Sequence, residues 1–174
     1  MSRRQTRLLL SWLIVSAAGI VVAEEKHELK PSPFCQGVMQ QIGVTPDEAI
    51  QKLGKPVSRE DRQMKSTHSE GVMDRIVILQ YTSARIGFLY LGDTKKYILL
   101  GADLTATMFG RALKDHVPPN RAAALSRLGE PKEAHDDPNT LRYFCTTDLN
   151  EWVDIVFDAH NQLTARIVFT SHID

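Results

Sequence analysis

The sequence predicts an α+β fold made of two tandem repeats, each a helix hairpin followed by a three-stranded antiparallel sheet, packed in two layers. One observation is an internal repeat, in which Leu53-Gly54-Lys55-Pro56 matches Leu128-Gly129-Glu130-Pro131. The other is that helix signals and then strand signals follow in the same order in both halves. We therefore expect repeat 1 over residues 32–103 and repeat 2 over residues 104–174.

Residues 1–23 are typical of a cleavable secretory signal peptide. Three arginines begin it, and the apolar run Leu8 to Val22 is shorter than the roughly 20 residues of a spanning helix. Small residues place the cut before Glu24, and an uncleaved anchor is the alternative. The general secretory and twin-arginine routes both stay open. We expect a soluble periplasmic protein with no stable membrane insertion after cleavage, and residues 24–31 as a linker.

Two short helices are predicted at the start of repeat 1. The first begins after Ser32 and carries an apolar stripe along one face. The second is predicted over Pro46 to Leu53, where Thr45 is the N-cap and Glu48 reaches back to the Thr45 amide. Gly54 then supplies the left-handed residue that ends the helix.

Repeat 2 carries similar helix signals, and both repeats end in strands. Asn120 is the expected N-cap there, and Gly129 with Pro131 stops the helix. Alternating apolar residues between turn signals mark three strands in each repeat. The strands are expected at Val72 to Thr82, Arg85 to Leu91 and Tyr97 to Ala102, and at Thr140 to Thr146, Glu151 to Phe157 and Leu163 to Thr170.

The chain has two cysteines, Cys35 and Cys145. An exported protein with one such pair most simply closes a disulfide between them. The alternative is a free or reactive thiol, but neither cysteine has a Cys-x-x-Cys spacing or a neighbouring histidine. Both should point into the core, so the sequence predicts a structural bridge.

Composition and motifs argue against catalysis and against binding of nucleic acid. The chain has 21 Lys and Arg against 21 Asp and Glu, and loss of the signal arginines leaves it mildly acidic with no basic block. It has no nucleophile elbow, no phosphate-binding glycine loop and no zinc-protease histidine pair. The six histidines stand singly, and His135-Asp136-Asp137 fits a solvated loop better than a metal site. We expect no enzyme, no cofactor and no metal.

The segment Gly43-Val44-Thr45 with Glu48, followed by Leu53-Gly54-Lys55-Pro56 and a strand meander, resembles the module of SmpA/OmlA-type outer-membrane assembly lipoproteins. Two such modules behind a signal peptide resemble the arrangement of the β-lactamase inhibitor protein family. The chain lacks the lipidated cysteine of the assembly lipoproteins. What the resemblance implies is a concave sheet face that binds another protein without chemistry.

Strand alternation predicts which residues would meet a partner. If Val153, Ile155 and Phe157 face the helices, their neighbours lie on the opposite face, although Trp152 and Phe144 could instead be buried between the repeats. The candidate protein-binding residues are Arg142, Phe144, Trp152, Asp154, Arg166 and Tyr97. We therefore expect a periplasmic, non-catalytic protein-binding module with a protein partner in the envelope, as inhibitor or immunity protein of an enzyme. The alternative is a structural factor in cell-envelope assembly or maintenance.

Overall fold

The computed structural model of the protein describes residues 32–108, 116–131, 133–146 and 150–172. The predicted signal peptide and linker lie outside these residues and stay predictions. None of the helices in the described segments is long and apolar enough to cross a membrane.

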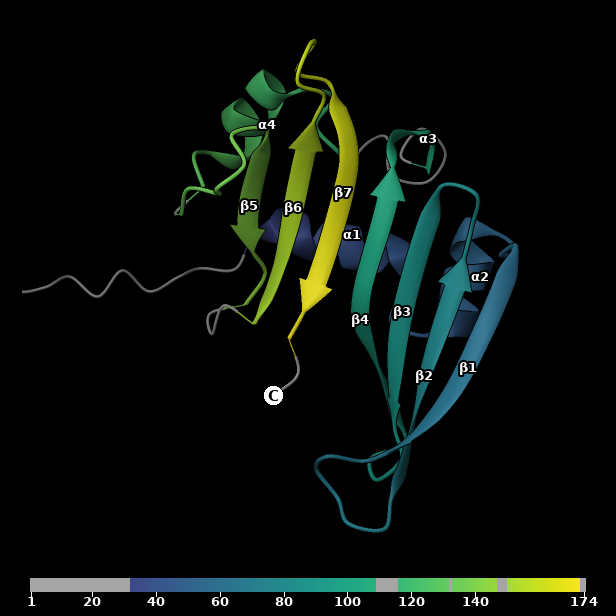
Figure 1. The fold of residues 1–174 in the computed structure, drawn as a ribbon. Helices are drawn as coiled ribbons and strands as arrows, with labels where there is room; N and C mark the ends of the chain where they lie inside the picture. The colour runs from purple at the N-terminus through teal and green to yellow at the C-terminus, as the bar shows by residue number, and fades with distance from the viewer. Residues whose placement is uncertain (1–31, 109–115, 132, 147–149, 173–174) are drawn as a thin grey trace, which may run out of the picture.

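The seven strands form one continuous antiparallel sheet in the order β1-β2-β3-β4-β7-β6-β5 (Figure 1). The prediction of two tandem units, each a helix hairpin with its own three-stranded sheet, is therefore wrong. The two halves join because β4 pairs with β7, from Gly101 opposite Thr170 to Thr105 opposite Arg166. This pairing satisfies backbone groups that separate sheets would leave on open edges. The strands are β1 (Ser58–Lys65), β2 (Met73–Gln80), β3 (Ala84–Leu91), β4 (Lys96–Thr105), β5 (Thr140–Phe144), β6 (Glu151–Phe157) and β7 (Thr164–Ser171).

The helices are few and short, and they do not form two equivalent hairpins. In the first half, α1 (Pro33–Ile42) and α2 (Pro46–Leu53) follow each other as expected. In the second half the structure describes α3 (Ala106–Met108) and α4 (Arg121–Leu128). The helix hairpin predicted for repeat 2 requires a first helix before Asn120, and residues 109–115 of that stretch lie outside the described segments.

The start and end of α2 are as predicted from the sequence, except for one hydrogen bond. The Thr45 hydroxyl accepts a hydrogen bond from the Glu48 amide at 3.2 Å, as an N-cap should. The Glu48 carboxylate accepts from the Val44 amide at 3.0 Å, whereas we predicted the Thr45 amide. Gly54 ends the helix with a φ of 88°, a value that favours glycine. Local capping therefore explains why this segment is helical.

Strand β1 was not predicted from the sequence. Its eight residues are all exposed, and six of them are charged or amide side chains. It lies at one edge of the sheet and pairs with β2 from Ser58 opposite Gln80 to Lys65 opposite Met73. A strand with solvent on both faces has no apolar alternation, and charged residues on an edge strand oppose pairing with a second molecule.

The core lies between the sheet and the helices, which cover one face only, with α1 running behind the strands in Figure 1. Each fully buried Val, Leu, Ile or Phe side chain contributes about 1.5–3 kcal/mol to stability. These residues come from α1 and from both halves of the sheet, so they make a single core. They include Val38, Ile42, Ile86, Phe88, Leu104, Ile155, Ile167 and Phe169.

The predicted disulfide between Cys35 and Cys145 is confirmed, with Cα atoms 5.2 Å apart. It joins α1 to the residue that follows β5, and both cysteines are buried. Beside it, the rings of Phe34 and Tyr143 meet edge to face at 6.3 Å between centroids. The Tyr143 hydroxyl donates to the Gly129 carbonyl at 2.9 Å, which ties the end of α4 to the same place. The bridge therefore holds together the start of the described chain and its second half.

Candidate protein-binding face

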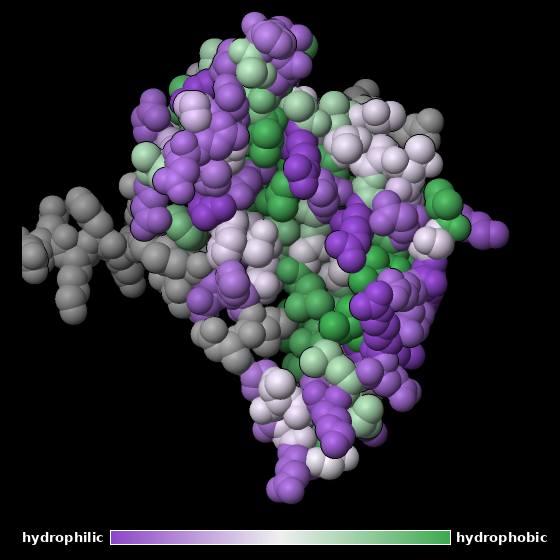
Figure 2. Space-filling view, viewed as in Figure 1, coloured by the Kyte–Doolittle hydropathy of each residue, from purple (hydrophilic) through white to green (hydrophobic). Residues whose placement is uncertain are grey.

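The face of the sheet turned away from α1 and α2 is called here the open face, because no helix of the described chain covers it. Figure 2 shows apolar side chains gathered over its middle, with hydrophilic side chains around them. An antiparallel sheet commonly presents polar residues on its solvent face. The half-buried apolar residues on this face therefore need an explanation. They are Ile76, Ile78, Ile98, Leu100, Phe144, Trp152, Val156 and Val168.

Five of the six predicted binding residues lie together on the open face. The register of β5 with β6 places Arg142 opposite Asp154 and Phe144 opposite Trp152. The register of β6 with β7 places Val156 opposite Arg166. Phe144 and Trp152 are half-buried on this face and are not part of the core between sheet and helices. Cross-strand pairing thus brings together the side chains that sequence alternation had grouped.

An ion pair between Arg142 and Asp154 lies at the β5 end of the open face. The guanidinium donates to both carboxylate oxygens, at 2.7 Å from Nε and 2.8 Å from the terminal nitrogen. This hydrogen bond to Asp154 raises the pKa of Arg142. The guanidinium also lies 4.7 Å from the centre of the Trp152 ring, a cation–π contact. Trp152 is thereby held in place from one side.

The Trp152 ring also lies next to the ring of His172, with the ring centres 5.2 Å apart. The indole Nε1 is buried and has no hydrogen-bond acceptor in the described part of the chain. A buried donor without an acceptor costs about 1–3 kcal/mol. Packing and the cation–π contact, not hydrogen bonding of the indole, therefore position this side chain.

A second ion pair, between Arg166 and Asp103, crosses the junction of the two halves. Arg166 on β7 donates to both oxygens of Asp103 on β4, each at 2.6 Å. The hydrogen bond to Asp103 raises the pKa of Arg166. Both side chains are well exposed, at 49% and 40%, so the pair contributes less to stability than its geometry suggests.

Tyr97, the sixth predicted residue, lies on the opposite face of the sheet. The pairing of β3 with β4 shifts register between Gly87 and Phe88, so Leu100 is an extra residue in β4. In the part of β4 before Leu100, each side chain therefore lies on the opposite face from the one that regular alternation predicts. The prediction that Tyr97 shares a face with Trp152 is therefore wrong. On its own side, Tyr97 contacts Tyr90 through tilted rings whose centres are 5.0 Å apart, and its hydroxyl accepts a hydrogen bond from Arg75.

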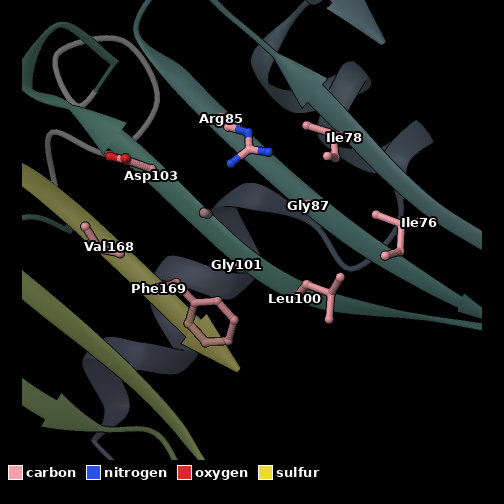
Figure 3. Close-up of a pocket in the computed structure, with 10 residues that line it drawn as sticks. Ile76, Ile78, Arg85, Gly87, Leu100, Gly101, Asp103, Val168 and Phe169 are labelled. Carbon is pink, nitrogen blue, oxygen red and sulfur yellow. The ribbon is translucent and has the colours of Figure 1, made fainter. Parts of the chain in front are cut away.

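A hollow of about 320 Å³ lies in the middle of the open face (Figure 3). Gly87 on β3 and Gly101 on β4 are paired directly across the strands and form its floor. Because neither has a side chain, the surface is open there. Glycines within predicted strands were the signal for this close approach, and sequence reasoning did not use it. Its walls are apolar, with two charged residues toward one end: Ile76, Ile78, Leu100, Val168, Arg85 and Asp103.

Replacing Gly87 with alanine should stabilise the protein by about 0.5–1 kcal/mol, because glycine within a strand loses more conformational freedom on folding. A Cβ at this position would meet only the Leu100 Cβ, at 3.8 Å, which is an ordinary contact. The matched change Gly54→Ala should instead destabilise by about 1 kcal/mol, since φ there is 88°. Urea unfolding of both variants measures the difference. A loss of stability in Gly87→Ala would contradict the geometry of the floor.

Among the described residues, no group of three or more His, Cys, Asp or Glu side chains could hold a metal ion. His135 and Asp137, from the loop considered above, are joined instead by a bond from the Asp137 amide to the His135 ring at 3.0 Å. The Asp137 carboxylate accepts from the Asn139 amide and the Thr140 hydroxyl, and these bonds lower the pKa of Asp137. These contacts are those of a structured turn.

Comparison with known proteins identifies no family. No family model matches the chain, and no curated protein matches it. Among solved structures, the crystal structure of a DUF4309 family protein from Bacillus subtilis aligns with a TM-score of 0.36 and 12% sequence identity. The alignment covers 74% of this chain and 78% of that one. A likeness at this level carries no argument about fold or function.

Proposed function

We propose that the chain is a non-catalytic protein-binding protein of the periplasm, which docks its open face onto an enzyme as an inhibitor or immunity protein. The observation that carries the proposal is the apolar middle of that face, left uncovered by the described helices and bordered by charged side chains. Exposed apolar patches with a polar rim mark sites of protein interaction. Antiparallel sheets offer such a surface when only one face packs on the core.

The arrangement around Trp152 supports the same role. Tryptophan and arginine most often dominate the binding energy of protein interfaces, and here Arg142 lies directly over the Trp152 ring. Asp154 neutralises that arginine within the chain, so a partner need not supply a counter-charge there. The surface therefore combines a large ring held in place with little uncompensated charge beside it.

The periplasmic part of the proposal rests on the disulfide and on the predicted signal peptide. Disulfides persist in oxidising compartments such as the periplasm and are rare where thiols are kept reduced. The bridge between Cys35 and Cys145 is compatible with export. Fractionation of cells, with the chain detected in the periplasmic fraction and trimmed at Glu24, tests this part directly.

Replacing Trp152 with alanine should weaken partner binding by about 2 kcal/mol or more, roughly thirtyfold, if that ring is an anchor of the interface. The experiment captures partners from a periplasmic extract on immobilised protein and then measures the affinity of the purified partner by calorimetry. Val57→Ala is the matched control, because Val57 is an apolar residue that is 74% exposed and precedes β1. Equal affinities of both variants would contradict the proposed face.

Deletion of the gene separates this role from envelope assembly. Loss of an immunity protein should harm cells only when the cognate enzyme is present, whereas loss of an assembly factor should make cells permeable when they grow alone. A permeability defect restored by a Trp152→Ala copy would contradict both the proposed role and the proposed face.

A further inference from the structure

Of the two glycines on the floor of the hollow, Gly101 lies close to the backbone of β7, where a Cβ would meet the Phe169 carbonyl oxygen at 3.2 Å, whereas Gly87 is not required by the fold. Gly87 has no positive φ, and a Cβ there would meet no closer atom than the Leu100 Cβ at 3.8 Å. A glycine inside a strand weakens it, so its presence here costs stability without relieving a clash. What the missing side chain provides is space on the open face, opposite the equally bare Gly101.

The size of the hollow limits what can occupy it. Binding sites for whole ligands measure about 300–1,000 Å³, and this hollow of about 320 Å³ lies at the low end. Ile76, Ile78, Leu100 and Val168 make its walls apolar. A single large apolar side chain fits this description better than a cofactor does.

One charged side chain at the hollow, that of Arg85, has no ion-pair partner among the described residues. Asp103 and Arg85 both line the hollow, and they lie opposite each other in the register of β3 with β4. Both oxygens of Asp103 are already bound by Arg166, however. The side chain of Arg85 is exposed and makes no hydrogen bond or ion pair within the described residues. Figure 3 shows its side chain beside the hollow. An exposed guanidinium without a partner is suited to bind a carboxylate, through two parallel hydrogen bonds.

We infer that the hollow receives one large apolar side chain of the protein partner, and that Arg85 binds a carboxylate next to it. The inference rests on the proposed function, because it names the chemistry of the segment that docks on the same face. The carboxylate is that of an Asp or Glu side chain or of a chain end, since the guanidinium binds these alike. Apolar contact in the hollow supplies affinity, and the ion pair fixes the direction of the segment.

The test needs no partner, because a small probe carries both features. The protein is labelled at Ile, Leu and Val methyl groups, and 4-phenylbutanoate is titrated in while NMR spectra are recorded. The signals of Ile76, Ile78, Leu100 and Val168 should shift, while that of Leu163, which is exposed elsewhere, should not. The neutral 4-phenylbutanamide should bind at least threefold more weakly. Equal affinity for acid and amide, or shifts away from the hollow, would overturn the inference.

Two variants test the ion pair of Arg85 and the space over Gly87 separately. Arg85→Gln should bind acid and amide equally, and Gly87→Ala should bind the acid at least threefold more weakly while its melting temperature stays the same or rises. Gly87→Ala with undiminished binding would overturn the role of the hollow. A partner whose affinity falls with Trp152→Ala but not with Arg85→Gln or Gly87→Ala would overturn this inference and leave the proposed function standing.

Discussion

Reducing the disulfide between Cys35 and Cys145 should lower the free energy of unfolding by about 4.7 kcal/mol. The bridge closes a loop with a sequence separation of 110 residues, and a loop near that length removes about this much conformational entropy from the unfolded chain. Both cysteines are buried beside Phe34 and Tyr143, and we expect these native contacts to change little on reduction. A loss of this size is comparable with the whole stability of many domains.

Urea unfolding followed by tryptophan fluorescence, with and without a reductant, measures the effect. The double variant Cys35→Ala with Cys145→Ala is the control for the chemistry of the reductant, since it should unfold at the same urea concentration in both solutions. Mass spectrometry of the oxidised protein verifies the bond. A difference below about 1 kcal/mol between oxidised and reduced protein would show that the bridge does not restrict the unfolded chain.

Replacing Arg142 with methionine should destabilise the fold by about 3 kcal/mol, the low end for removing one partner of a buried ion pair. The change leaves the carboxylate of Asp154, which is only 8% exposed, without the two hydrogen bonds that compensate its burial. It also removes the cation–π contact with Trp152.

Arg166→Met is the matched control, since it removes the same kind of bidentate pair from a place where both side chains are well exposed. That variant should lose less than about 1 kcal/mol. Adding Asp154→Asn to Arg142→Met removes the buried charge and should restore most of the loss. Thermal or urea unfolding of the unchanged protein and the three variants measures these differences in stability. Equal losses of stability in the two arginine variants would contradict the role of burial.

Local signals in the sequence were sufficient for elements whose boundaries depend on neighbouring residues. Thr45, Pro46 and Gly54 determine both ends of α2, and the helix runs from Pro46 to Leu53 as predicted. The alternation of Val153, Ile155 and Phe157 likewise gave β6 its boundaries and its buried face. In these places the chemistry of a few adjacent residues decides the structure.

The features that were missed depend on distant parts of the chain. Strand β1 forms because β2 offers it a partner, and no residue in its sequence shows this. The union of β4 with β7 decides that there is one sheet, and apolar alternation is the same for one sheet or two. The candidate site was affected likewise, since the extra residue Leu100 moved Tyr97 to the other face. Apolar alternation alone does not reveal a bulge.

The bridge also has a mechanical consequence. If a protease or a translocating motor pulls on the C-terminus while the start of the chain is held, the tension passes through the two sulfur atoms and bypasses everything between Cys35 and Cys145. Of the strands that the structure describes, β1 to β5 lie inside that bypassed loop, and only β6 and β7 lie outside it. On the C-terminal side of the bridge the extensible part is residues 146–174, about 100 Å when fully stretched, whereas the reduced chain would extend several times further. An oxidised molecule pulled in this way yields its last two strands and then resists.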